Sequence, residues 1–394
     1  MLRISEVQEQ LRKTNIDGWL LYDFQGLNPI AKKLLGLTGH LLTRRWYYWV
    51  PKQGPPAILC HRIEQHSFSA LTGRPYIFKS WAEMHEGLQV ILQGHETVAM
   101  EYSPQCSIPY VSRIDAGTVE TIKDLGKKVV SSANLVQYFE ARWSDEQFQM
   151  HQEASRLLLQ ILFDGFREVS HAIKRGRNFT EFTVQQDLLD KYRQHSLISF
   201  SPPIVGVNEN SGNPHYEPKK EASRSIKSGD LLLIDLWAKL QKANAVYADY
   251  TWVGYAGEMI PENYLRIWDL VRGARDAALN FVRKNYLEGV RIQGWQVDSV
   301  ARDIISREGY GEYFVHRTGH SIGEEDHGNG ANMDSLETKD ERLLIPHTCF
   351  SVEPGIYLND FGIRSEVNVY LNDSEVIVTG EPIQKEIVKI LQLS

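Results

Sequence analysis

The chain has 394 residues, enough for two or three domains of ordinary size, and a formal net charge of −7. Hydrophobic residues make up 42% and charged residues 24%, a balance that excludes the disordered, collagen-like and coiled-coil classes. The acidic net charge argues against a protein that binds nucleic acid through a general basic surface.

Cysteine usage and hydropathy indicate the setting in which the protein works. Cys60, Cys106 and Cys349 form an odd set without close spacing, so neither a disulfide framework nor a thiolate zinc site is expected. The first residues contain no apolar segment of secretory type, and no apolar run approaches the roughly 18 residues that a membrane span requires. We therefore expect a soluble, cytoplasmic protein that does not contact a membrane.

The first 142 residues alternate helical and strand patterns. The segment "SEVQEQLRKTNI" is amphipathic at helical period. The segments "DGWLLYD" and "RRWYYWVPKQGPPAILCH" predict strands around a Pro/Gly turn. The aromatic run "RRWYYWV" should pack inside this domain. Residues 1–142 are therefore predicted to form an α/β domain.

Residues 143–394 are predicted to form a second domain. It begins with a long helix, for which Ser144 is the N-cap and Gln147 stands in capping-box register. Three more helical stretches follow, interspersed with the strand segments "LLLIDLWAKL", "AVYADYTWVGYAG", "CFSVEPGIYL" and "GIRSEVNVYL". Short connections between these segments favour antiparallel pairing, which indicates an α+β domain with helices over a curved sheet.

Each of these strand segments carries a carboxylate where a core residue is expected. The four acids are Asp235, Asp249, Glu353 and Glu366. A single acid of this kind is usually a solvated strand end or a salt-bridge partner. Four acids in such positions instead indicate a shared site, because a buried carboxylate is very unfavourable unless it is paired, neutralised or bound to a cation.

A histidine cluster strengthens the hypothesis of a cation site. The stretch "HRTGHSIGEEDHGNG" places His316, His320 and His327 close together among glycines and acids. Carboxylate oxygens with a single imidazole suit Mn²⁺, Co²⁺ or Zn²⁺, and several bridging carboxylates are what two neighbouring ions require. The residues by themselves leave open whether the cluster is a metal site or a polar loop.

The order of these residues resembles the ligand signature of the pita-bread metallopeptidases, the group that contains aminopeptidase P, prolidase and methionine aminopeptidase. The matching positions are Asp235, Asp249, His320 in "HRTGHSIG", Glu353 in "VEPGIY" and Glu366 in "GIRSE". The stretch from "AMEYSP" to "FEARWSDEQ" resembles the creatinase-like amino-terminal domain of the Xaa-Pro members. The resemblance therefore covers most of the chain and implies a creatinase-like domain at 1–142 and a pita-bread catalytic domain at 143–394.

The resemblance implies a dinuclear centre, with Mn²⁺ as the first choice and Co²⁺ or Zn²⁺ as alternatives. Hydroxide bridging the two ions would attack the scissile carbonyl, Glu353 would shuttle the proton, and His327 would assist the oxyanion. His215 matches a histidine that contacts substrate, although its Pro/Gly/Asn-rich context alone would suggest a surface residue. His316 matches a family histidine and equally fits a structural role.

Two accessory residues also match family positions near the dimetal centre. Tyr357 fits a core residue or a hydrogen-bond donor better than a catalytic acid. Arg364 shares strand parity with Glu366, so a role in orienting a ligand is expected.

Two positions depart from the family pattern. Trp237 replaces the glycine that usually follows the first aspartate by two residues, and Asp249 stands fourteen positions after Asp235, a longer spacing than is usual. Trp252 stands where the family often has an arginine. A longer exposed hairpin accounts for the spacing, and the two tryptophans are expected to affect substrate preference.

The leading hypothesis is a metal-dependent Xaa-Pro peptidase that cleaves the bond before proline, with a prolidase-like dipeptidase favoured over an aminopeptidase P. A dipeptidase needs a cation for the free carboxylate of its substrate, and the candidates are Arg342 and a residue of the amino-terminal domain. Alternatives of other classes are a metal-free hydrolase like creatinase and a non-catalytic binding module on the same fold. The resemblance also implies a small peptide with proline in second position as substrate, and a homodimer.

Overall fold

The computed structural model describes residues 2–393 and divides into two compact units, Met1–Glu140 and Ala141–Ser394. The boundary expected from the sequence lies two residues further along, between 142 and 143. Among the residues described, no helix combines the length and the apolar character needed to cross a bilayer.

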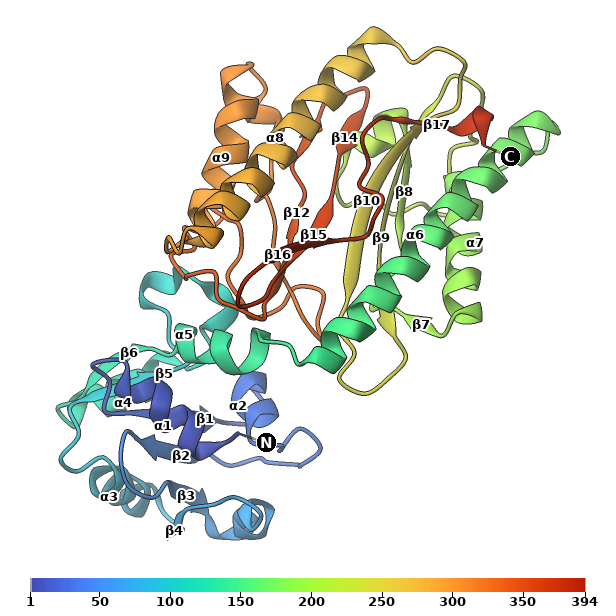
Figure 1. The fold of residues 1–394 in the computed structure, drawn as a ribbon. Helices are drawn as coiled ribbons and strands as arrows, with labels where there is room; N and C mark the ends of the chain where they lie inside the picture. The colour runs from blue at the N-terminus through green and yellow to red at the C-terminus, as the bar shows by residue number, and fades with distance from the viewer. Residues whose placement is uncertain (1, 394) are drawn as a thin grey trace. The chain divides into compact units, whose positions relative to one another are not determined.

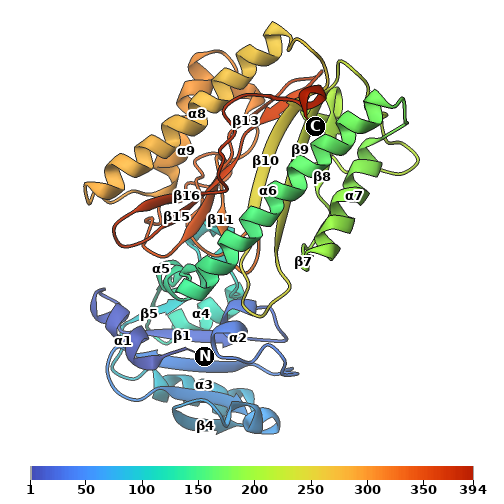
Figure 2. The same ribbon diagram turned by 45° about the vertical axis from the view of Figure 1, so that its right-hand side comes forward.

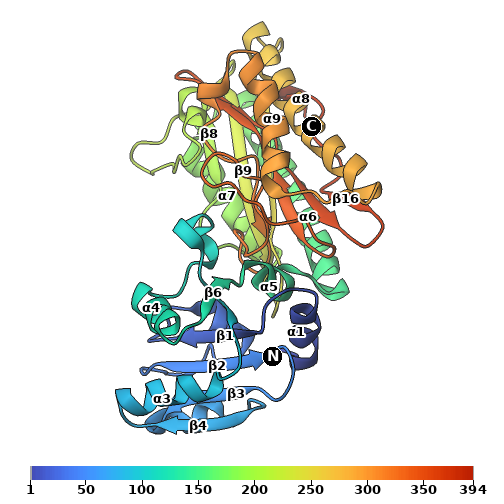
Figure 3. The same ribbon diagram turned by 90° about the vertical axis from the view of Figure 1, so that its left-hand side faces the viewer.

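The first unit is a mixed six-stranded sheet with strand order β4-β3-β2-β1-β5-β6 (Figure 3). Strands β1, β2 and β3 pair antiparallel, whereas the β1–β5, β3–β4 and β5–β6 pairs are parallel. The strands are β1 (Gly18–Asp23), β2 (Trp46–Pro51), β3 (Ala57–His61), β4 (Arg74–Phe78), β5 (Thr97–Met100) and β6 (Lys128–Ser131). The helices are α1 (Ile4–Arg12), α2 (Pro29–Leu34), α3 (Trp81–Ile91), α4 (Ala116–Asp124) and α5 (Ala133–Val136).

The aromatic run on β2 serves both faces of this sheet. Trp46 and Tyr48 belong to one apolar core, and Tyr47 and Trp49 to another, as the two-residue period of a strand requires. All four side chains are buried, which confirms that the run packs inside the amino-terminal unit.

The second unit begins with the predicted long helix. The Ser144 hydroxyl oxygen accepts a hydrogen bond from the Gln147 N–H, and Gln147 Oε1 accepts one from the Ser144 N–H, so the predicted capping box is confirmed. The helices are α6 (Asp145–Lys174), α7 (Glu181–Gln194), α8 (Glu262–Leu287) and α9 (Gly294–Arg307).

The strands of this unit pair antiparallel, with the exception of the parallel β10–β17 pair. They form a five-stranded, a four-stranded and a two-stranded sheet. The strands are β7 (Leu197–Ile198), β8 (Ile204–Val207), β9 (Leu231–Leu240), β10 (Ala248–Tyr255), β11 (Ser321–Ile322), β12 (Cys349–Val352), β13 (Gly355–Tyr357), β14 (Gly362–Arg364), β15 (Val367–Leu371), β16 (Val376–Thr379) and β17 (Val388–Lys389). The mainly antiparallel arrangement confirms the predicted α+β class.

Helices cover these strands from two sides. Figures 1 and 2 show α6 and α7 on one side and α8 and α9 on the other. One apolar core joins α6 and α7 to the even-numbered residues of β9, among them Leu232 and Ile234. The other core joins α8 and α9 to the odd-numbered residues Leu231 and Leu233 and to the carboxy-terminal strands. The odd-numbered face of β9 therefore looks into the middle of the unit.

Two of the predicted strands are interrupted at their glutamates. The segment 349–358 divides into β12 and β13 around Glu353, and the segment 362–371 divides into β14 and β15 before Val367. Pro354 has no N–H to offer a sheet, which accounts for the first break. Glu353 and Glu366 are thus placed in gaps of the sheet rather than within strands.

Candidate metal centre

The hairpin of β9 and β10 presents two aspartates on its inner face. Asp235 and Asp249 both occupy odd-numbered positions, and the pairing places Thr251 opposite Asp235 and Trp237 opposite Asp249. Asn368 of β15 clamps the Asp249 backbone, because its Oδ1 accepts from the Asp249 N–H at 3.0 Å and its Nδ2 donates to the Asp249 carbonyl at 2.7 Å. Asp249 is therefore held between two sheets.

The carboxy-terminal half brings His320, Glu353 and Glu366 to the same place. The N–H of Ser351 donates to the His320 carbonyl at 2.9 Å, and the N–H of Glu353 donates to the Thr318 carbonyl at 2.7 Å. The N–H of Glu366 reaches the Thr251 carbonyl of β10 at 3.3 Å. Backbone bonds between segments far apart in sequence thus assemble the cluster.

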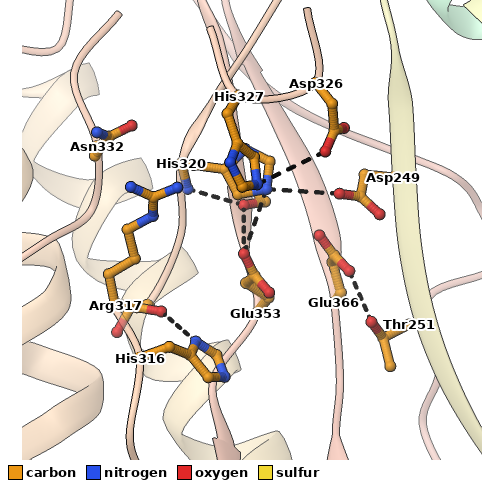
Figure 4. Close-up of polar contacts among 12 residues, drawn as sticks. Asp249, Thr251, His316, Arg317, His320, Asp326, His327, Asn332, Glu353 and Glu366 are labelled. Carbon is orange, nitrogen blue, oxygen red and sulfur yellow. Dashed lines mark hydrogen bonds and ion pairs between the residues drawn. The ribbon is translucent and has the colours of Figure 1, made fainter. Parts of the chain in front are cut away.

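The side chains converge on His320, as Figure 4 shows. Its Nε2 lies 3.5 Å from Asp249 Oδ2 and 3.4 Å from Glu353 Oε1. Asp249, His320 and Glu366 each offer one ligand atom, and these atoms lie within 4.8 Å of one another. Such a spacing lets one cation contact all three residues.

The unsatisfied polar atoms of the cluster fit a bound cation. Asp249, His320 and Glu366 are only 2–5% exposed, yet Asp249 Oδ1 and Glu366 Oε1 have no hydrogen-bond partner. A buried carboxylate oxygen without a donor is strongly destabilising, and a divalent ion supplies the missing partner. The donor set of carboxylates and one imidazole suits Mn²⁺, Co²⁺ or Zn²⁺.

Protonation equilibria in the cluster reflect the same crowding. Burial, followed by repulsion from Glu366, raises the pKa of Asp249, and burial raises the pKa of Glu353 to about 7. Burial also lowers the pKa of His320, with His327 contributing, so that this imidazole is neutral at physiological pH. Neutral imidazole is the form that ligates metals.

Asp235 joins the cluster through Thr251 and Arg364. Its Oδ1 accepts from Thr251 Oγ1 at 2.9 Å, and its Oδ2 accepts from the Arg364 guanidinium. The same Thr251 hydroxyl lies 2.8 Å from Glu366 Oε2. The single Thr251 hydroxyl proton can be donated to only one of these two carboxylates, so either Asp235 Oδ1 or Glu366 Oε2 receives no hydrogen bond from it.

His316, Tyr357 and Arg364 form a connected group beside the cluster. His316 Nε2 lies 2.7 Å from the Tyr357 hydroxyl, which accepts from Arg364 Nη1 at 3.2 Å. Burial, followed by the charge of Arg364, lowers the pKa of His316 to about 3. The three side chains are therefore tied to one another, with His316 neutral.

His327 and His215 lie at the exposed rim. The His327 side chain is 53% exposed, and its ring centroid is 4.2 Å from that of His320. His215 is exposed on a loop that Glu181 anchors by accepting from the Tyr216 hydroxyl at 2.8 Å. Burial raises the pKa of Asp235, and Arg364 and, to a smaller extent, His215 oppose that shift, so His215 and Asp235 lie in electrostatic range.

Arg342 does not fit the role considered for it from the sequence. Its guanidinium is buried and makes a two-pronged ion pair with Asp340, at 3.0 Å from Nε and 2.6 Å from Nη2. Its Nη1 donates to the Asn329 carbonyl at 2.8 Å. These bonds leave no free face for a substrate carboxylate, so the interpretation of Arg342 as its receptor is wrong.

The two tryptophan departures have different consequences. Trp252 occupies an even-numbered position of β10 and packs edge-on against Phe163 of α6, with ring centroids 5.0 Å apart. It therefore faces away from the carboxylates. Trp237 faces the cluster from its place opposite Asp249 and lies 6.0 Å, centroid to centroid, from the largely exposed Phe200.

Sequence reasoning missed Thr251, Asn368 and Asp326 at this site. Asp326 is only 4% exposed and lies beside His320 and His327. In the sequence it ends the acidic run "GEED", which has the composition of a solvated loop. A polar residue at the same strand parity as Asp249 was the one available signal for Thr251.

Comparison with known proteins decides the family. The model of "Metallopeptidase family M24" matches residues 153–373, more than half of the chain. The chain belongs to this family. The resemblance inferred from the ligand order is thereby confirmed.

Relatives within the M24 family extend the likeness. The chain is 32% identical over 197 residues to an Xaa-Pro dipeptidase of Lactobacillus helveticus, covering 50% of this chain and 49% of the relative. It is 35% identical over 204 residues to the Xaa-Pro dipeptidase of Lactobacillus delbrueckii subsp. lactis, covering 51% and 50%. The matched region thus spans about half the length of these curated relatives.

A solved structure supports the fold over the whole chain. The crystal structure of dipeptidase PepE from Mycobacterium ulcerans superposes with a TM-score of 0.71 at 20% identity, covering 98% of this M24 chain and 96% of that one. The likeness confirms the predicted pita-bread architecture.

Proposed function

We propose that this M24 protein is a metal-dependent Xaa-Pro peptidase that hydrolyses the bond before proline, with a preference for dipeptides. The observation that carries the proposal is the buried set of Asp249, His320 and Glu366, whose ligand atoms lie within 4.8 Å and whose carboxylates keep unpartnered oxygens. The names of the Lactobacillus relatives support the Xaa-Pro specificity and the dipeptidase preference.

The ligands that we propose for two divalent cations, Mn²⁺ in the first place, are Asp235, Asp249, His320, Glu353 and Glu366. When bound, the cations would polarise the scissile carbonyl and lower the pKa of the attacking water. Arg364 and Thr251 orient Asp235 through their hydrogen bonds, which fixes the direction of its carboxylate.

Glu353 is the proposed proton carrier. In the metal-free protein burial raises its pKa to about 7, and bound cations would favour its ionised form, which is the form that accepts a proton. Its carboxylate takes a proton from the attacking water and delivers it to the prolyl nitrogen that leaves. His327 and His215 stand at the rim of the site, where a peptide enters, and we assign them to substrate contact.

Aminopeptidase P activity on longer peptides is the alternative. The ion pair of Arg342 with Asp340 removes one candidate receptor for the free carboxylate of a dipeptide, which favours this alternative. A direct comparison of substrate lengths separates the two.

The test is hydrolysis of an Xaa-Pro dipeptide beside an Xaa-Pro-Xaa tripeptide. Protein stripped by chelator is reloaded with Mn²⁺, Co²⁺ or Zn²⁺, and metal-restored cleavage of the dipeptide is expected. Preference for the tripeptide would assign the protein as an aminopeptidase P. Cleavage that persists in the stripped protein would indicate a metal-free hydrolase like creatinase.

A matched pair of variants ties the activity to the cluster. Glu353→Gln should abolish cleavage, whereas Asp303→Asn, on the exposed face of α9, should leave it unchanged. No cleavage of either peptide with any ion, in a folded wild-type protein, would contradict the proposal and favour a binding module.

A further inference from the structure

Asp326 brings another carboxylate to the candidate metal centre. It follows β11 in the loop between His320 and His327, and its side chain is 4% exposed. Asp326, His320 and His327 offer one ligand atom each, and these atoms lie within 4.8 Å of one another. Because His320 also belongs to the set with Asp249 and Glu366, the two sets share an imidazole.

One oxygen of the Asp326 side chain lacks a partner, and the other side of the carboxyl group faces Asp249. Its Oδ1 is buried without a hydrogen-bond partner, and its Oδ2 lies 3.7 Å from His327 Nε2, beyond hydrogen-bond range. Figure 4 shows its carboxylate beside that of Asp249, pointing toward the two histidines. Two buried carboxylates side by side repel each other unless a proton or a cation lies between them.

The loop backbone directs Asp326 inward. The Gly328 N–H donates to the Ser321 carbonyl at 2.7 Å, and the Tyr247 N–H donates to the Gly323 carbonyl at 2.9 Å, so both ends of the loop are anchored. The preceding residue, Glu325, is exposed. The two neighbouring acids therefore differ sharply in environment, although their sequence context is the same.

We infer that Asp326 is a metal ligand, a carboxylate additional to the five that the family pattern supplies, and that it binds the cation nearest His320. The inference rests on the proposed function, since it assumes that the cluster holds divalent ions. An oxygen donor at this position suits Mn²⁺ and Zn²⁺ alike and adds negative charge to the site. A merely structural alternative is that Asp326 orients the His327 ring.

Metal binding separates the two roles. Chelator-stripped wild-type protein and the Asp326→Asn and Asp326→Ala variants are titrated with Mn²⁺ by calorimetry, and metal content is measured after desalting. We expect the variants to lose at least about tenfold in affinity for one cation, with the other retained. Co²⁺-loaded protein should show an altered visible absorption band, because the band reports the ligands of the ion.

Glu325→Gln is the matched control, because it removes the same charge from the adjacent exposed position. It should bind Mn²⁺ like the wild-type protein. Far-UV circular dichroism and thermal unfolding of the stripped proteins check that the Asp326 and Glu325 variants fold.

Unchanged Mn²⁺ affinity and an unchanged Co²⁺ spectrum in the folded Asp326 variants would overturn the inference, even if their kcat or KM changed, since that pattern is expected of a residue that only positions His327. Absence of cation binding by the wild-type protein would overturn the proposed function and this inference together.

Discussion

Glu101 of the amino-terminal unit and the acids of the candidate metal centre are buried in opposite ways. In the amino-terminal unit, Glu101 is fully buried and accepts hydrogen bonds from Trp19 at 2.6 Å, Asn28 at 2.8 Å and Ser132 at 2.9 Å. In the second unit, Asp249 and Glu366 are almost as deeply buried, but each keeps an oxygen without any donor.

The difference shows that burial of an acid does not by itself indicate a metal site. Glu101 has a donor for each oxygen, so it needs no ion and ties a strand to its neighbours. Asp249 and Glu366 of the candidate metal centre keep acceptor oxygens without donors, and only a cation or protonation corrects that deficit. Donors on both oxygens thus account for Glu101 without an ion, whereas the unpartnered oxygens of Asp249 and Glu366 fit a ligand role.

The largest expected effect is on activity and follows from removing a ligand. Asp249→Asn should lower kcat/KM for an Xaa-Pro peptide by roughly a thousandfold, which corresponds to about 4 kcal/mol. Metal-free protein should not lose stability, because the substitution relieves repulsion from Glu366. Peptidase assays and thermal unfolding of stripped protein measure the two effects, and a destabilised metal-free variant would break the comparison.

Glu101→Ala should instead lower the stability of the protein and leave its peptidase activity unchanged. Three donors lose their acceptor inside the core, so the free energy of unfolding should fall by about 3 kcal/mol. Metal affinity and kcat per folded molecule should not change. Urea unfolding with and without Mn²⁺ measures this, and a loss of metal binding in folded Glu101→Ala protein would argue against the separation of roles.

Stability of the metal-free protein should fall as pH rises. The pKa of Glu353 in the folded state is about 7, against an ordinary value of 4.5. Between these two pH values the folded state therefore binds a proton that the unfolded state has released. Its contribution is fully present below pH 4.5 and is lost as pH rises through about 7, a change of up to about 3 kcal/mol. Metal binding should reverse the trend, since cations favour the ionised carboxylates.

Thermal unfolding between pH 5 and 8, with and without Mn²⁺, measures this prediction. Parallel curves for the two forms would show that the carboxylates are not coupled to metal.

The smallest expected effect concerns Trp237, which lies opposite Asp249 on the neighbouring strand. Trp237→Ala should shift the ratio of kcat/KM for Leu-Pro over Gly-Pro by about tenfold toward the larger substrate, the range that a changed apolar pocket allows. Trp252→Phe, under α6, is the control and should leave the ratio unchanged. An equal shift in both variants would place the effect outside the pocket.

Much of the fold could be predicted from local signals in the sequence. The capping box at Ser144 and Gln147 and the apolar run of β9 appear in the structure where they were predicted, because capping and strand burial depend on neighbouring residues. The interruption of the last strands at Glu353 and Glu366 was not predicted. Pro354 signals the first break in the sequence, whereas only the pairing partners reveal the second.

What the sequence by itself determined is the α+β class and the ordered set of Asp235, Asp249, His320, Glu353 and Glu366. Residue type and order along the chain are sufficient for that inference. Only the tertiary structure decided which acids lack donors. It also showed that the Arg342 guanidinium is paired with Asp340 and that Trp252 faces away from the cluster. Asp326 is buried, whereas the neighbouring Glu325 is exposed. Donors for a buried acid come from segments distant in sequence, and their arrival depends on how the sheets and loops pack.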